Sequence, residues 1–261
     1  MTAEVAAAYS ESASAWQAGP GRIYDRLADV VVSHCPIPLA GCRVLDHGAG
    51  TGAAGRAVAS AGAATVIAVD AAFGMLAHER RTRPPAVAGD ALALPFAADV
   101  FDVVIAAFSL NHLVDPAAGL RELVRTVRRR GAIVAAVYAA DDAHPVKVAT
   151  EEAMVSFGWR PPSWYAEVRE SAMPTLASAE GCRSAFVAAG LDPHVDALRV
   201  AFSGLGATEL IEWRLGMAQH APFLASLPRA ERAALAAAAR TRLGTGWPPL
   251  ERSILVASAL V

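Results

Sequence analysis

Apolar residues follow two different spacings in the first half of the chain, and their alternation predicts a layered fold. Short continuous apolar runs, such as TVIAVD at residues 65–70, are typical of strands buried on both faces of a parallel sheet. Between these runs, apolar positions recur at helical spacing. Strands that alternate with helices in this way predict βαβ units with right-handed crossovers. The expected strands span residues 43–46, 65–70, 86–88, 101–106 and 131–138.

The segments between these strands carry helix boundary signals. Gly62 ends the helical pattern that follows the first strand, and Pro116 suits the first turn of the helix after the fourth strand. We therefore expect a doubly wound, Rossmann-like α/β core. Ahead of it, residues 3–34 predict one or two helices that break at Gly19-Pro20-Gly21. The helices expected within the core span residues 53–61, 72–81 and 116–129.

The alternation loosens after Tyr138. Residues 141–178 combine four aromatic side chains with the pair Pro161-Pro162, and we interpret them as a helical lid over the carboxyl edge of the sheet. Ser226 is a candidate N-cap for a later helix that ends before Gly244. The remaining helices are expected at residues 179–190, 208–219 and 228–243, and the remaining strands at 194–202 and 252–260.

The stretch VLDHGAGTG, residues 44–52, joins the first expected strand to a helix through three glycines at alternate positions. Glycine adopts positive φ and has no Cβ, so such a loop lets the backbone approach a nucleotide-like ligand. Gly50-x-Gly52-x-x-Gly55 also satisfies the dinucleotide fingerprint, and Asp70 follows at a suitable distance. Asp46 distinguishes a dinucleotide from a nucleoside that carries an amino acid. Its carboxylate would repel the pyrophosphate of the first but attract the ammonium group of the second. It favours an amino acid attached to a nucleoside.

Several motifs together resemble one family. They are Asp46-x-Gly48-x-Gly50-x-Gly52, TVIAVD, Met75-Leu76, GDALALPF and FDVVIAAFSLNHL. This set resembles the class I S-adenosylmethionine-dependent methyltransferases over residues 43–138, and most closely the small-molecule enzymes that methylate quinone precursors and secondary metabolites. The resemblance implies a seven-stranded sheet, mostly parallel, whose antiparallel last strand lies between strands five and six. Residues 252–260 are the candidate for that strand.

The resemblance also implies roles for residues along the strand ends. Gly48 and Gly50 would let the backbone approach the methionine part of the cofactor, and Asp46 would orient its amino group. Asp70 would accept hydrogen bonds from two ribose hydroxyls, which suits a carboxylate with two acceptor oxygens. The nucleobase would lie between the next two loops, and the sulfonium near the fourth strand. The implied cofactor-binding residues are Asp46, Gly48, Gly50, Asp70, Ala71, Met75, Asp90, Ala91, Ala107 and Phe108.

On this interpretation the chain has four regions. Residues 1–40 form an N-terminal helical cap and residues 41–140 the S-adenosylmethionine-binding α/β core. Residues 141–180 form a helical lid over a substrate pocket, and residues 181–261 complete the core with strands six and seven and a helical insertion.

Methyl transfer from a sulfonium is an in-line displacement, so the protein must mainly align the acceptor and exclude water. A base is optional. His112 lies just beyond the fourth strand and is the first candidate; it could equally order the loop by a hydrogen bond. His144, after the fifth strand, is the second. Arg160 and Arg169 are candidates for binding an acidic group of the substrate, although isolated arginines on helices mostly face solvent.

Aromatic residues outside the core are candidates for the acceptor pocket. A wall of such side chains suits a flat organic molecule, although each of them could instead pack the interior of the helical regions. The candidate substrate-binding residues are Tyr9, Trp16, Trp159, Trp164 and Tyr165.

Charge and cysteine usage narrow the partners. The formal charge is -2 and the pI about 6.4, and the longest basic run is Arg128–Arg130, so we expect no nucleic-acid partner. The three cysteines match no zinc or disulfide spacing, and the apolar runs are too short for a membrane span. Adjacent Asp141 and Asp142 suggest a metal site only weakly, and we expect no metal. We expect a cytoplasmic monomer or homodimer.

The leading hypothesis is a methyltransferase that uses S-adenosylmethionine, forms S-adenosylhomocysteine and methylates an O, C or N atom of a small organic molecule in secondary metabolism. A nicotinamide-dependent reductase is an alternative, because the glycine loop and Asp70 also fit that class. A third reading keeps the fold and the cofactor but replaces methyl transfer by a cyclisation or rearrangement.

Overall fold

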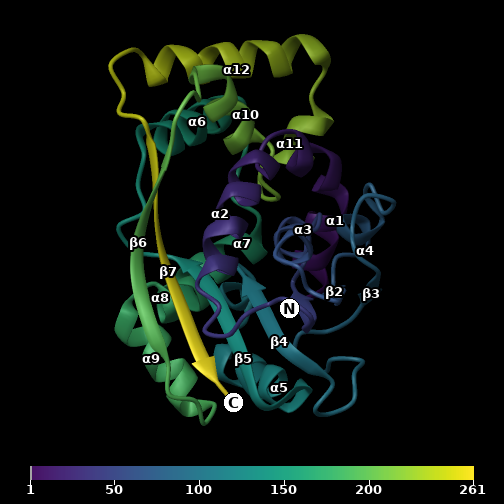
Figure 1. The fold of residues 1–261 in the computed structure, drawn as a ribbon. Helices are drawn as coiled ribbons and strands as arrows, with labels where there is room; N and C mark the ends of the chain where they lie inside the picture. Colours follow the sequence, from purple (N-terminus) through teal and green to yellow (C-terminus); the bar gives the residue numbers. More distant parts are fainter. Residues whose placement is uncertain (1) are drawn as a thin grey trace.

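A seven-stranded sheet forms the centre of the molecule in the computed structural model, which describes residues 2–261 (Figure 1). The strand order is β3-β2-β1-β4-β5-β7-β6, and β7 runs antiparallel to both of its neighbours. The doubly wound fold and the inserted antiparallel last strand are therefore confirmed. The strands are β1 (Arg43–His47), β2 (Thr65–Asp70), β3 (Ala86–Ala88), β4 (Phe101–Ala107), β5 (Val127–Tyr138), β6 (His194–Phe202) and β7 (Leu250–Leu260).

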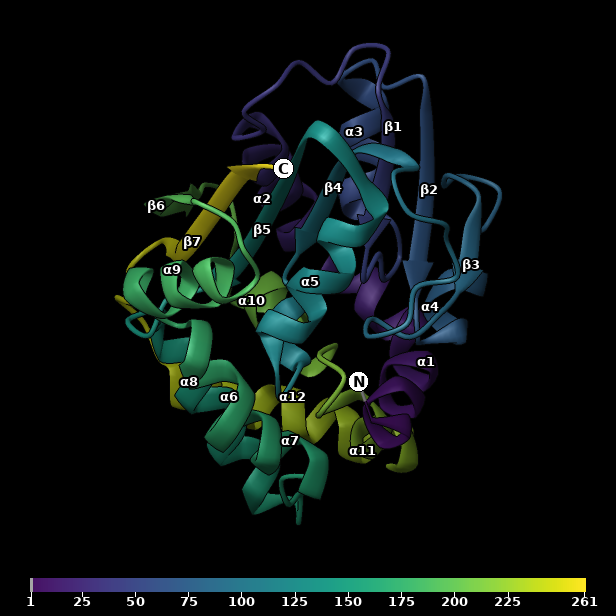
Figure 2. The same cartoon turned by 90° about the horizontal axis from the view of Figure 1, so that it is seen from below.

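Alternate side chains of the central strands pack into two separate hydrophobic cores, one on each face of the sheet. Val103 and Ile105 of β4 pack on one face of the sheet, and Val104 and Ala106 pack on the other; all four are fully buried. Burial on both faces explains why the strand reads as a continuous apolar run. Helices therefore cover both faces, and Figure 2 shows α5 and α9 in front of the sheet, with α2 and α3 behind it.

The helices before the lid are α1 (Ala3–Ala18), α2 (Gly21–Ser33), α3 (Ala53–Ser60), α4 (Phe73–Ala77), the 3-10 turn η1 (Leu110–His112) and α5 (Pro116–Thr126). Residues 141–180, a segment called the lid below as a name only, contain α6 (Pro145–Ser156), α7 (Ser163–Glu167), the π-helical turn η2 (Val168–Ala172) and α8 (Met173–Leu176). The remaining helices are α9 (Ala179–Ala188), α10 (Ala207–Leu215), α11 (Ala221–Ser226) and α12 (Arg229–Leu243).

The boundary between α5 and β5 differs from the expectation. The helix ends at Thr126, and the arginines expected in its last turn belong to the first part of β5. Val127 pairs with Phe101 across a register shift, and Arg130 has φ +64°, so this segment is an irregular extended chain. Its polar side chains stay exposed at the amino end of the sheet, which explains why they resembled a solvated helix end.

Three other helix predictions were too long or misplaced. Helix α4 ends at Ala77 because the chain turns back there, and Arg83 donates to the Met75 carbonyl from Nη1 at 3.0 Å. Helix α10 ends at Leu215, before Gly216. Ser226 is the last residue of α11 and not an N-cap; Pro228 precedes α12 instead.

The N-terminal helix and the lid share a small core of their own. Val5 of α1 packs with Trp164 and Val168 of the lid and with Ala218 after α10. Figure 2 shows α1, α7 and α11 at the same end of the molecule. Segments distant in sequence are thus packed together beside the carboxyl edge of the sheet.

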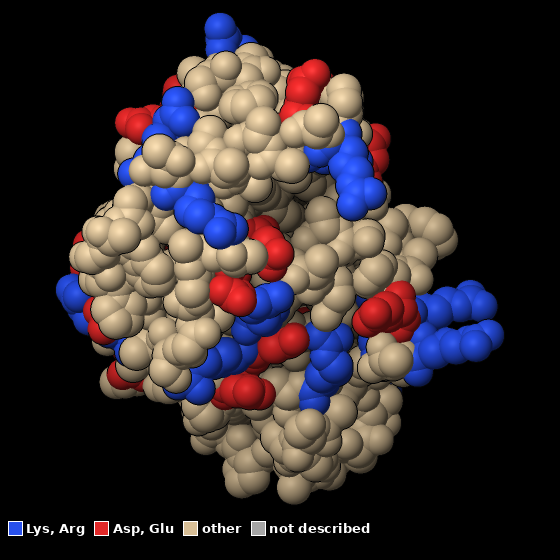
Figure 3. All heavy atoms as spheres, turned by 90° about the horizontal axis from the view of Figure 1, so that it is seen from above, with Lys and Arg blue, Asp and Glu red and all other residues tan. Residues whose placement is uncertain are grey.

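Surface charge is mixed on the face shown in Figure 3, where basic and acidic side chains lie interspersed. Within residues 2–261, none of the helices combines the length and the hydropathy that crossing a membrane requires.

Candidate functional site

A cavity of about 730 Å³ lies at the carboxyl ends of the parallel strands. Asp46, Asp70, Ala107 and Tyr138, which line it, come from the ends of β1, β2, β4 and β5. The carboxyl ends of parallel strands meet at one edge of a sheet, where open α/β sheets bind their ligands. The lid, the N-terminal helices, α10 and β7 supply most of the rest of the lining, and a cavity of this size holds small organic molecules.

The glycine loop forms one wall of the cavity. Gly48, Gly50 and Gly52 have φ values of +66°, +51° and +93°, a region that L side chains rarely adopt. A Cβ at Gly48 would clash with the Ser109 side chain, so packing against the β4 loop also requires a glycine there. A Cβ at Gly50 would meet no atom within 4 Å. Gly50 is therefore the position where the open space remains for a ligand.

Asp46 is a buried carboxyl group with one unused oxygen. It is 1% exposed, and its Oδ2 accepts a hydrogen bond from the Gly55 amide at 2.8 Å. No residue that the structure describes donates to Oδ1. Burial raises the pKa of Asp46 to about 7, although the Gly55 bond and the charge of Arg83 oppose the shift. A cationic group of a ligand would stabilise the ionised form.

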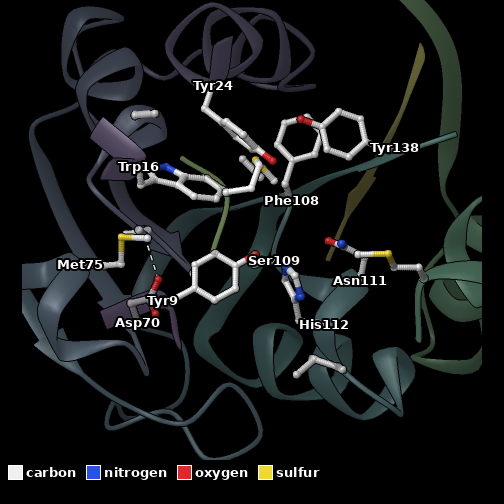
Figure 4. A pocket seen from close by; sticks show the side chains of 18 of the residues that line it. Tyr9, Trp16, Tyr24, Asp70, Met75, Phe108, Ser109, Asn111, His112 and Tyr138 are labelled. Atoms are coloured by element: carbon white, nitrogen blue, oxygen red, sulfur yellow. Dashed lines mark hydrogen bonds between the residues drawn. The ribbon is translucent and has the colours of Figure 1, made fainter. Parts of the chain in front are cut away.

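Asp70 holds the loop and also faces the cavity. Its Oδ2 accepts from the Gly50 amide and its Oδ1 from the Ala72 amide, both at 2.8 Å. Burial still raises the pKa of Asp70. Each carboxylate oxygen has a second lone pair, so both can also accept from a diol. Met75 lies beside Asp70 in Figure 4 and packs with Trp16.

The loop after β3 differs in part from the expectation. Gly89 and Ala91 line the cavity, but Asp90 is exposed and is absent from the described lining. The Oδ1 atom of Asp90 accepts from the Leu92 amide at 3.1 Å. The structure thus brings Ala71, Met75, Ala91, Ala107 and Phe108 to the cavity together with the glycines and the acids of β1 and β2, but it does not bring Asp90 there.

Aromatic side chains surround the other end of the cavity. Phe108 and Tyr138 stack with ring centroids 4.7 Å apart, and Tyr24 meets both rings edge-on (Figure 4). Neither Tyr24 nor Tyr138 was predicted from the sequence as a pocket residue. Tyr138 is the last residue of β5, and its place at the carboxyl edge of the sheet could have indicated this role. The expected substrate-binding residues Tyr9, Trp16, Trp164 and Tyr165 line the cavity.

Trp159 does not join this wall. It is 2% exposed and belongs to the core on the α2 side of the sheet. Its Nε1 donates to the Gln219 carbonyl at 3.1 Å, which satisfies the one polar atom of the ring. We therefore assign Trp159 to packing and not to the acceptor pocket.

His112 points into the cavity toward Tyr9 (Figure 4). Its Nε2 lies 3.2 Å from the Tyr9 hydroxyl, and its buried Nδ1 has no partner within the described part of the chain. Burial lowers the pKa of His112 to about 4. The imidazole is therefore neutral near pH 7 and can exchange a proton with a ligand.

His144 does not lie in the cavity. Its Nδ1 accepts from the Val146 amide at 3.2 Å and so caps α6, and its Nε2 donates to the Pro248 carbonyl at 2.9 Å. Both ring nitrogens are thus used by the backbone, and we do not retain His144 as a second candidate base.

A buried ionic cluster lies at the lid end of the cavity. The Arg252 guanidinium donates to both carboxylate oxygens of Asp142, at 2.9 and 2.8 Å, and Lys147 binds the same carboxylate. The guanidinium carbon lies 3.9 Å from the Tyr138 ring centroid and 4.6 Å from that of Trp213. Asp142 therefore has cationic partners in the protein itself, and residues 2–261 contain no group of three metal-ligating side chains.

Comparison with known proteins agrees with this geometry. Residues 45–135 match a family model described as a methyltransferase domain. A demethylmenaquinone methyltransferase of Clavibacter sepedonicus is 39% identical over 139 residues, which are 51% of this chain and 55% of the relative. One of Mycolicibacterium gilvum is 47% identical over 92 residues, 35% of this chain and 40% of the relative. The chain spans about half the length of the curated relatives it matches, or less.

Solved structures show the same fold across most of the chain. The cyclase SpnF has a TM-score of 0.56 and 23% identity, covering 90% of this chain and 80% of that protein. The phosphoethanolamine N-methyltransferase 2 of Haemonchus contortus, solved with S-adenosyl-L-methionine, has a TM-score of 0.56 and 17% identity, covering 90% of this chain and 52% of the enzyme. At these identities the likeness concerns the fold alone. Together with the sheet order, it shows a Rossmann-like methyltransferase fold, within which residues 45–135 match the methyltransferase domain model.

Proposed function

We propose that this protein binds S-adenosylmethionine at the strand ends and transfers its methyl group to an O, C or N atom of a small organic molecule. The observation that carries the proposal is a pair of carboxyl groups, the buried Asp46 and the half-buried Asp70, on either side of the open space at Gly50. An ammonium group suits the unused oxygen of Asp46, and a ribose diol suits the two oxygens of Asp70. One ligand that carries both groups would satisfy both acids.

The other cofactor contacts follow from position. Met75 and Ala91 lie where a nucleobase attached to that ribose would extend, and Ala107 and Phe108 lie beyond the glycine loop, where the sulfonium would be. Bound S-adenosylmethionine supplies a methyl group on a positively charged sulfur. Asp90 is not in the proposed set, because its carboxylate bonds the Leu92 amide at the surface.

The acceptor is proposed to lie against Tyr24, Tyr138 and Trp213. Their rings favour a flat molecule, and the lid and α1 would exclude water from it. The residues on this side lie outside the matched range 45–135, apart from the β4 loop. The acceptor side is thus the part of the chain that the family model does not describe, and we propose an acceptor from secondary metabolism and a cytoplasmic location.

Calorimetry tests the cofactor half of the proposal, and a labelled-methyl assay tests the transfer. We expect S-adenosylmethionine and S-adenosylhomocysteine to bind with one-to-one stoichiometry, and label to reach one class among phenols, quinols, amines and activated carbons. Failure of both compounds to bind would refute the proposal, and binding of NADH in their place would support a reductase. Cofactor binding without transfer to any acceptor class would contradict the transfer and favour a cyclisation or rearrangement.

We further propose that His112 removes a proton from the acceptor. In a His112→Gln variant, kcat should fall by about 100-fold, while the Kd of S-adenosylhomocysteine should change by less than about threefold. Because burial lowers the pKa of His112 to about 4, its basic form persists as pH falls and is lost only near that pKa. The wild-type kcat at saturating substrates should thus be flat between about pH 7.5 and 5.5.

The pH profile separates this role from an ordinary one. For a histidine with an unshifted pKa near 6.5, the fraction of neutral imidazole would be about tenfold lower at pH 5.5 than at pH 7.5. The kcat would then fall by about the same factor. Such a fall would contradict the assignment of a low pKa. An unchanged kcat in His112→Gln would show that the side chain only orders the loop.

A further inference from the structure

Arg214, in α10, is a buried cation without a counterion. It is 7% exposed and lines the cavity. Its Nε atom has no hydrogen-bond partner, and its guanidinium forms no ion pair, among the residues that the structure describes. Glu151, the carboxylate whose charge favours the ionised form of Arg214, already pairs with Arg169 at 3.6 Å. A charge buried without a partner is unfavourable, so this arrangement indicates a missing anion.

The surrounding charges do not supply that anion. Arg252 and Lys147 share the single carboxylate of Asp142, and the Nη1 atom of Arg252 has no partner in the described chain. Arg169 and Glu151 balance one another. Four cations, Lys147, Arg169, Arg214 and Arg252, therefore face two carboxylates, Asp142 and Glu151, along this part of the cavity lining.

The two ends of the cavity have opposite polarity. Asp46 and Asp70 lie at the glycine-loop end, whereas the surplus cations lie at the lid end. An acceptor with a negative group would be drawn in with that group toward the lid, so its opposite end would point to the cofactor site. The charge distribution along the cavity would thus determine the orientation of the acceptor as well as favour its binding.

We propose that Arg214 binds an anionic oxygen group, a carboxylate or a phosphate, on the methyl acceptor. The guanidinium carbon of Arg214 lies 5.4 Å from the Trp213 ring centroid, and that of Arg252 lies 4.6 Å from the same ring. Trp213 therefore joins both guanidinium groups to the aromatic wall, and a flat acid would place its ring near the aromatic side chains and its oxygens at Arg214. This inference rests on the proposed function, because it names the class of the acceptor.

Calorimetry with small probes tests the proposal on protein saturated with S-adenosylhomocysteine. Benzoate, phenyl phosphate and neutral benzamide share one ring and differ in charge. We expect at least one anion to bind about tenfold or more tightly than benzamide, and Arg214→Gln to weaken that anion by about tenfold to hundredfold while benzamide is unaffected. The stronger of the two anions identifies carboxylate or phosphate. The control Arg232→Gln changes an exposed arginine of α12 and should behave as wild type.

Separate measurements keep the two proposals apart. If S-adenosylhomocysteine binds none of the variants or the wild type, the proposed function fails. If it binds normally but the anions bind no better than benzamide, or bind equally well to Arg214→Gln, the anion site is refuted. As an independent check, Arg214→Met should leave the ligand-free Tm equal to or above that of wild type, because an unpaired buried charge is removed. A clear fall in Tm would mean that the fold itself requires the guanidinium, and would overturn the inference.

Discussion

Replacement of Asp70 by alanine should weaken the binding of S-adenosylmethionine by at least about 100-fold, because hydrogen bonds to a charged group contribute about 1.5–3 kcal/mol each. The proposed ribose contacts are two such bonds. The variant also leaves the amides of Gly50 and Ala72 without their acceptor, so the glycine loop loses its attachment to the end of β2. Isothermal calorimetry on folded protein, verified by circular dichroism, measures the effect.

Asp115 offers a matched control. Like Asp70 it accepts hydrogen bonds from the backbone, since its Oδ1 accepts from the Ala118 amide at 2.8 Å and caps α5, but it lies outside the described lining of the cavity. Asp115→Ala should lower stability by about 1 kcal/mol through loss of the cap. It should leave the cofactor Kd unchanged. If Asp70→Ala binds the cofactor within tenfold of wild type, the ribose assignment is wrong, and Asp70 only holds the backbone at Gly50 and Ala72.

Replacement of Asp142 by alanine should lower the free energy of unfolding by about 3–5 kcal/mol, the range for breaking a buried ion pair from one side. Arg252 and Asp142 are each 4% exposed in their side chains, so the guanidinium would remain buried without its bidentate partner. Lys147, whose pKa burial already lowers to about 8, would lose the same carboxylate. Urea denaturation at pH 7 measures the change.

Asp102 offers a control in which the cationic partner of the aspartate is accessible to solvent. Its carboxylate is also buried, but its ionic partner Arg128 has a side chain that is 60% exposed. Water can solvate Arg128 after the change, so Asp102→Ala should have a smaller effect, about 1–3 kcal/mol, mainly from the unsatisfied Arg43 amide. Equal losses of unfolding free energy in the two variants would contradict the view that the unpaired, buried Arg252 guanidinium causes most of the loss in Asp142→Ala.

The strands of the core could be predicted because their signal is local. A strand buried on both faces must be apolar at successive positions; β2 begins and ends where that pattern does, and β4 extends it by one residue. The start of β5 could not be predicted in this way. Val127 pairs with Phe101, and the three arginines that follow it remain exposed. The positive φ of Arg130 accompanies a register shift that no local pattern predicts.

The same distinction applies to the site. Asp46, Gly50 and Asp70 lie at two neighbouring strand ends, so the topology alone places them together. Trp213, Arg214 and Arg252 come from α10 and β7, and only tertiary packing brings them to the cavity. Trp159 and Trp164 are close in sequence and chemically alike, yet one packs in the core and the other lines the cavity. Which way each ring faces depends on partners from α1 and α10 that lie far away in sequence.

The glycine loop is held on both sides of the same residue. The Gly50 amide donates to Asp70, and its carbonyl accepts from Nη1 of Arg83 at 2.8 Å. Arg83 also binds the first helix after β2, so the loop, the strand end and α4 form one rigid unit. Ordering a flexible residue on ligand binding costs about 1–2 kcal/mol of conformational entropy. This loop has already lost that entropy in folding, so contacts made by an incoming ligand contribute to its affinity almost undiminished.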